Sequence, residues 1–123
     1  MRLILAALLI ANVACSSSPT EPGAGRTIAL RYGETATVAN TRISFTEIVD
    51  SRCPKDVVCA WAGDAAVHLK SGGASVVLHT NGAAGSASDS LAGLTITLVE
   101  VKPEPISSGT SKTDYVATLH VAG

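Results

Sequence analysis

The chain has 123 residues, with nine Lys and Arg against ten Asp and Glu, and a formal net charge of −1 at pH 7. This length predicts one domain, and the balanced charge gives no basic surface of the kind that binds nucleic acid or an anionic membrane. Only four residues are aromatic, so stacking platforms for bases or sugars are sparse.

The first fourteen residues have the composition of an export signal. Arg2 supplies a positive charge, residues 3–11 are apolar but too few to span a bilayer, and the small residue Ala14 ends the segment. We therefore expect residues 1–14 to be a signal peptide that is removed on export.

Cys15 comes next and opens a segment rich in Ser, Pro and Gly, residues 15–25. A lone cysteine after a small residue, followed by such a segment, resembles the lipobox and tether of bacterial lipoproteins. The resemblance implies a lipid anchor on Cys15 and, from Ser16, the outer membrane of a Gram-negative cell; Asn12 departs from the pattern, which prefers Leu there. The alternative is ordinary cleavage and a secreted product. In both cases residues 15–25 are expected to be a flexible linker.

Short β-branched runs separated by turn residues make up the rest of the chain, residues 26–123. Hydrophobic residues alternate with a period of two, and no window has a helical stripe. Predicted strands cover residues 27–31, 35–38, 42–50, 65–70, 75–80, 94–102 and 115–121, with turns between them, including 81–90. This spacing favours one all-β domain: a small antiparallel β-sandwich of about seven immunoglobulin-like strands, or a partly open barrel.

The run 42–50 does not alternate cleanly along its whole length. Ile43 and Phe45 share one face, whereas Ile48 falls on the other. We expect a twist or bulge near the end of this strand that buries Ile48 and Val49.

Cys53 and Cys59 form an even pair once Cys15 is assigned to the lipid. In the oxidising compartment that an exported chain reaches, we expect them to form a disulfide. The bridge closes a loop that contains residues 54–58, and the chain-entropy model gives it about 2 kcal/mol of stabilisation. The spacing does not match the Cys-x-x-Cys turn of redox proteins.

A dense motif surrounds these two cysteines. It consists of Asp50-Ser51-Arg52-Cys53-Pro54, then Cys59, then Trp61-Ala62-Gly63. The motif resembles a family of small, largely uncharacterised bacterial lipoproteins and exported proteins, and the similarity extends over most of the mature chain. The resemblance implies export, the disulfide and a β fold. It implies no activity, cofactor or catalytic residue.

The structural interpretation of this motif is a corner of the fold that the disulfide holds in place. Asp50 and Arg52 lie on the same side of an extended segment, where they could pair across one residue or cap backbone groups of the turn. Trp61 is expected to lie over the Cys53–Cys59 bridge and to seal one end of the core.

The functional interpretation is that the constrained loop is presented to a partner, because pre-organisation lowers the entropy lost on binding. A small protease inhibitor displays a loop in this way. Pro54 and Lys55 would then form the inserted edge, with Lys55 as the anchor for a basic-specific protease.

His68, His79 and His120 each lie in a predicted strand between apolar neighbours, so we expect them to point away from the core. A metal site completed by Asp64 or Asp114 would need their strands to be adjacent, and unrelated exposed histidines are the favoured interpretation. No strained Gly-x-Ser-x-Gly turn is present. We expect no enzyme activity and no cofactor. The leading hypothesis is an envelope-anchored binding, interaction or structural module with an envelope or extracellular protein as partner; a protease inhibitor and a metal-binding hydrolytic domain are the alternatives.

Overall fold

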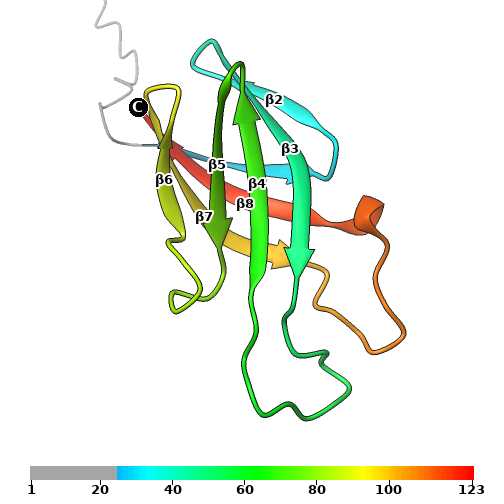
Figure 1. The fold of residues 1–123 in the computed structure, drawn as a ribbon. Helices are drawn as coiled ribbons and strands as arrows, with labels where there is room; N and C mark the ends of the chain where they lie inside the picture. Colours follow the sequence, from blue (N-terminus) through cyan, green and yellow to red (C-terminus); the bar gives the residue numbers. More distant parts are fainter. Residues whose placement is uncertain (1–24) are drawn as a thin grey trace, which may run out of the picture.

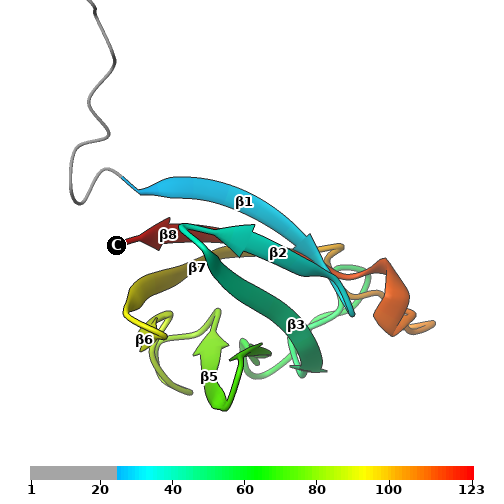
Figure 2. The ribbon, with the colours of Figure 1, turned by 90° about the horizontal axis from the view of Figure 1, so that it is seen from above.

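The computed structural model describes residues 25–123, which form eight strands in two antiparallel sheets packed face to face (Figures 1 and 2). The predicted signal peptide, Cys15 and nearly all of the predicted tether lie outside the described residues. None of the helical segments in residues 25–123 has the length and apolar character needed to cross a membrane.

Each sheet has four strands. The first contains, in spatial order, β1 (Arg26–Arg31), β8 (Val116–Ala122), β7 (Leu94–Lys102) and β6 (Ser88–Leu91). The second contains β2 (Thr35–Val38), β3 (Thr41–Asp50), β4 (Ala65–Ser71) and β5 (Ala74–His79). The predicted small antiparallel sandwich is confirmed: the eight strands form two antiparallel sheets and no closed barrel. The strand order also differs from that of immunoglobulin domains.

Seven of these strands coincide with predicted ones to within one residue at either end, but β6 lies in a segment predicted to be a turn. β6 pairs with β7 from Ser88 opposite Thr97 to Leu91 opposite Leu94. Only Leu91 of β6 is buried, and the other three residues are polar. A strand with one buried side chain has no alternating pattern, which is why the sequence did not indicate it.

The core fills the space between the sheets with small branched side chains. Its buried hydrophobic members are Leu30, Val38, Ile43, Phe45, Ile48, Ala65, Val67, Leu69, Leu78, Leu91, Leu94, Ile96, Leu98, Val101, Tyr115, Ala117, Leu119 and Val121. Phe45 also makes an edge-to-face contact with Tyr32, at 5.6 Å between ring centroids. The inward faces of the strands therefore account for the alternation in the sequence.

Two β-bulges change which residues face the core. The pairing of β3 with β4 shifts between Phe45 and Glu47, which returns Ile48 to the core. The bulge prediction was right for Ile48 and wrong for Val49, which is 58% exposed, because one extra residue reverses the face of everything that follows it. A second shift, in β7, buries Val101.

The two ends of the sandwich differ. The start of β1 and the end of β8 lie at one end, and the long β3–β4 loop, residues 51–64, extends from the other (Figure 1). The β7–β8 connection, residues 103–115, lies beside this loop, since the Lys55 N–H donates to the Pro105 carbonyl over 3.0 Å. The predicted motif is thus concentrated at one end of the molecule.

Candidate interaction site

The two legs of the β3–β4 loop continue the antiparallel pairing of their strands. The Ser51 N–H donates to the Asp64 carbonyl over 2.7 Å, and the Cys53 N–H donates to the Ala62 carbonyl over 3.3 Å. Gly63 has a φ of +67°, and a Cβ atom there would lie 1.9 Å from the Ser51 carbonyl oxygen. The legs can approach this closely only because residue 63 is glycine.

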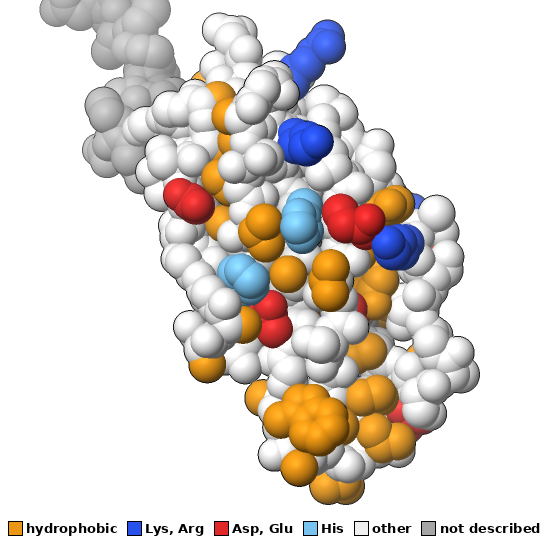
Figure 3. Space-filling view, in the orientation of Figure 1, with side chains coloured by type: hydrophobic (Ala, Val, Ile, Leu, Met, Phe, Trp, Pro, Cys, Tyr) orange, Lys and Arg blue, Asp and Glu red, His pale blue; other side chains and the backbone are white. Residues whose placement is uncertain are grey.

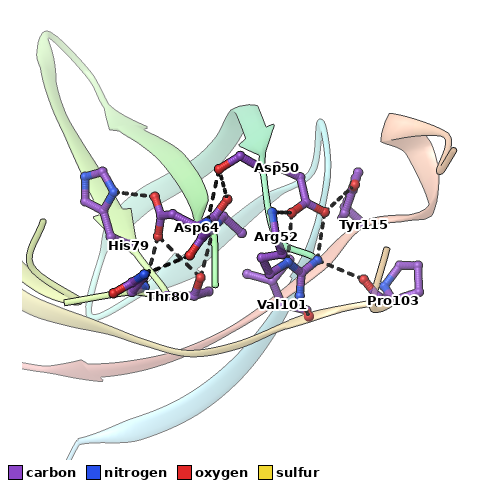
Figure 4. Close-up of polar contacts among 12 residues, drawn as sticks. Asp50, Arg52, Asp64, His79, Thr80, Val101, Pro103 and Tyr115 are labelled. Carbon is purple, nitrogen blue, oxygen red and sulfur yellow. Dashed lines mark hydrogen bonds and ion pairs between the residues drawn. The ribbon is translucent and has the colours of Figure 1, made fainter. Parts of the chain in front are cut away.

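An ionic network fixes the base of the loop (Figure 4). Arg52 Nε and Nη2 donate to the two oxygens of Asp50 over 2.8 and 2.9 Å, which confirms the predicted pair. The guanidinium also donates to the carbonyls of Val101 and Pro103, each over 2.9 Å. The Tyr115 hydroxyl donates to Asp50 over 2.7 Å. The network therefore ties the loop to the β7–β8 connection of the other sheet.

Burial raises the pKa of the Asp50 carboxyl. Hydrogen bonds from Arg52 and Tyr115, together with the Arg52 charge, lower it by more, so the net pKa lies below the ordinary value of 3.8. Burial and the hydrogen bond to Asp50 raise the pKa of Tyr115. At neutral pH the network consequently holds a charged carboxylate, a guanidinium and a neutral phenol.

A second cluster, which the sequence did not indicate, fixes the other leg. The buried Asp64 carboxylate accepts hydrogen bonds from His79 Nδ1 over 2.7 Å, the Asn81 N–H over 2.9 Å and the Thr80 hydroxyl over 3.3 Å. The Asn81 amide donates to the Gly63 carbonyl over 2.9 Å. Burial raises the pKa of Asp64, but its hydrogen bonds, led by that from His79, lower it more. This cluster joins the loop to the connection that follows β5.

The upper part of the loop is braced as well. The predicted Cys53–Cys59 disulfide is present, with 5.8 Å between the Cα atoms. Within the ring that it closes, the Val57 N–H donates to the Pro54 carbonyl over 3.2 Å. Asp56, also within the ring, is bound from outside it: the Ser107 N–H donates to the Asp56 carboxylate over 2.9 Å, and the Ser107 hydroxyl bonds the same carboxylate. The loop is thereby held against the β7–β8 connection.

Trp61 does not seal the core: the residue is 69% exposed, so this prediction was wrong. A different aromatic residue, Tyr115, is buried at this end, with 5% exposure. Its hydroxyl reaches Asp50. The paired legs carry Trp61 beyond the body of the sandwich.

Trp61 belongs to a group of exposed hydrophobic side chains at the end of the loop. Val58 is 100% exposed, Val57 44%, and Ile106 of the neighbouring connection 38%. We call these four residues the apolar tip. Figure 3 shows hydrophobic side chains gathered at this end of the molecule. The apolar tip is convex and projects into solvent.

An open pocket of about 570 Å³ lies beside the loop. Its lining comes from the β3–β4 loop and from the connections that follow β5 and β7, and it includes Arg52, Lys55, Asn81 and Glu104. The Arg52 guanidinium is committed to the ionic network, so Lys55 and Glu104 supply the lining charges outside it.

The three histidines are not brought together. His68 lies on β4 and His79 on β5, whereas His120 lies on β8 of the other sheet, next to Thr27. Within residues 25–123, no three His, Cys, Asp or Glu side chains are arranged to hold a metal ion. His79 is bound to Asp64 instead, so the geometry gives the metal-binding alternative no support.

No protein-family model matches the chain, and neither a curated protein nor a solved structure shows significant similarity to it. The resemblance of residues 50–63 to small bacterial lipoproteins therefore stays a prediction.

Proposed function

We propose that the chain is an exported binding module attached to the bacterial envelope through Cys15. The module contacts a protein partner through the apolar tip. The observation that carries the proposal is the exposure of Val58 and Trp61 on a loop whose two legs are hydrogen-bonded to each other and whose cysteines form a disulfide. Exposed hydrophobic patches on small domains mark interaction sites, and tryptophan is enriched among residues that dominate binding energy.

A purely structural role for the loop does not account for its end. The disulfide and the two side-chain clusters stabilise the legs, whereas Val58 and Trp61 bury little or nothing against the core. A loop with only a structural role would be equally stable with polar residues in place of Val58 and Trp61. The rigid base lowers the entropy that a partner must overcome on binding.

The attachment point and the apolar tip lie at opposite ends of the domain. The described chain begins next to β1, at the end of the sandwich opposite the β3–β4 loop (Figure 1). A lipid on Cys15 would hold that end near the membrane. The proposed contact surface is then directed away from the point of attachment.

Site-specific photo-crosslinking in the native host tests this proposal. A photoreactive amino acid at position 57, a partly exposed member of the apolar tip, should give a discrete crosslinked protein, and Trp61→Ser in the same chain should reduce its yield at least fivefold. The control is the same amino acid at Lys70, an exposed residue on β4 near its turn with β5. Equal crosslinking from positions 57 and 70, or none from position 57, would overturn the proposal.

A further inference from the structure

We propose that the apolar tip inhibits endopeptidases whose specificity pocket accepts a small aliphatic side chain, with Val58 as the residue that enters the pocket. The inference rests on the proposed function and names the class of its protein partner. Val58 is the most exposed large hydrophobic residue of the described chain and stands next to Cys59, one end of the disulfide.

The main chain around Val58 is free to bind. Among the hydrogen bonds of residues 25–123, none uses the backbone N–H groups of residues 58–61 or the carbonyl of Val58. Endopeptidases hold a substrate through its main-chain N–H and C=O groups while one side chain fills the specificity pocket. The segment at the end of the loop offers both kinds of contact together.

The size and shape of the apolar tip favour a protein cleft over a second copy. Its four side chains expose on the order of 400 Å² of apolar surface, whereas each partner in a standard interface buries about 800 Å². A flat contact between two copies of the apolar tip would be too small. A cleft that surrounds a convex loop also buries its legs and the adjacent connection.

A bilayer is a poorer match. Inserting the end of the loop into hydrocarbon would strand the unpaired N–H groups of residues 58–61, which is costly because lipid tails accept no hydrogen bonds. Lys55 is the only cation in residues 53–63, so anionic lipids have little to attract. A protein cleft can accept those hydrogen bonds.

The identity of the exposed residue sets the specificity. A valine side chain fits the small pocket of an elastase-type protease, lacks the charge that a trypsin-type pocket requires, and leaves a chymotrypsin-type slot partly empty. Lys55, the anchor predicted from the sequence, lies inside the turn from Pro54 to Val57, and its N–H is bonded to Pro105. It cannot present an extended main chain without breaking these bonds.

The bracing of the loop explains inhibition rather than simple cleavage. Hydrolysis of the Val58–Cys59 peptide bond adds one water, leaving a carboxylate on Val58 and an amine on Cys59. The Cys53–Cys59 disulfide would still join the two new ends, and the Cys53 N–H would still reach Ala62. An amine held beside the acyl group re-forms the bond in competition with release.

Inhibition assays test the inference directly. The protein, produced from its full sequence and exported so that the disulfide forms, should inhibit pancreatic elastase at submicromolar concentration, and trypsin and chymotrypsin at least tenfold more weakly. Val58→Lys should lose at least 100-fold of the elastase inhibition and gain inhibition of trypsin. The matched control, Lys55→Ala, should change elastase inhibition by less than twofold. Thermal melting of each variant verifies that it is folded.

Three results would overturn the inference: no elastase inhibition by the folded protein, equal inhibition by Val58→Lys, or rapid cleavage after Val58 without inhibition, seen as a mass gain of one water. The proposed function is judged separately. If crosslinking from position 57 persists without inhibition, the binding module stands and its partner is not a protease of this class. If both are absent, both proposals fail.

Discussion

Replacing Arg52 by Met tests the most connected part of the site. The change removes four hydrogen bonds and leaves the Asp50 carboxylate, whose side chain is 7% exposed, without its cation. Breaking a buried ion pair costs 3–5 kcal/mol, and because the Arg52 side chain is 16% exposed we expect the lower end, about 3 kcal/mol. In a domain of about 100 residues this lowers the melting temperature by roughly 12–24 °C.

Urea and thermal unfolding at pH 7, followed by circular dichroism, measure the effect. The double variant Asp50→Asn with Arg52→Met should be more stable than Arg52→Met alone, because the stranded charge is gone. As a control, Lys112→Met removes an exposed ion pair with Glu47 and should leave the midpoint unchanged. A loss below about 1 kcal/mol for Arg52→Met, or strictly additive effects of the two changes, would refute the reasoning.

Three further predictions concern pH, backbone geometry and processing. Because the pKa of Asp50 is lower in the folded than in the unfolded chain, the contribution of Asp50 to stability is present above about pH 4 and is lost as the pH falls through the folded pKa. Asp50→Asn should therefore make the free energy of unfolding fall less steeply between about pH 5 and 2, and parallel curves of stability against pH for the two proteins would contradict this. Gly63→Ala should cost more than about 3 kcal/mol in urea unfolding or prevent folding, because its Cβ meets the Ser51 carbonyl, whereas Gly72→Ala, with a φ of +57° in open space, should cost about 1 kcal/mol; equal losses would contradict the close approach. Intact mass spectrometry of the protein from membranes should give a lipidated chain that begins at Cys15 and gains two hydrogens on reduction, and an unlipidated mass would show a secreted product instead.

The strands could be predicted because burial on one face imposes an alternating pattern on the sequence. The pattern fails where that cause is absent, as in β6, where Leu91 alone faces the core. In β3 the pattern indicated a bulge but not its position, because the shift between Phe45 and Glu47 depends on pairing with β4. Val49 was therefore assigned to the wrong face.

The candidate site was predictable only where its contacts are local. Asp50 and Arg52 are two residues apart, and their pairing needs only an extended chain. The bond from His79 to Asp64 instead requires the register of β4 against β5, which places Ala66 opposite His79. Nor does a sequence indicate how far a loop projects, so the exposure of Trp61 could not be inferred.

Trp61 is the only tryptophan in the chain, and its exposure decides what its fluorescence can report. Its indole is largely hydrated in the native protein, so unfolding should move its emission maximum very little, and fluorescence would record an almost silent transition while circular dichroism changes fully. Enclosure of the same indole by another molecule should instead shift its emission to shorter wavelength. The emission of Trp61 should therefore report contacts made by the end of the loop and change little when the core unfolds.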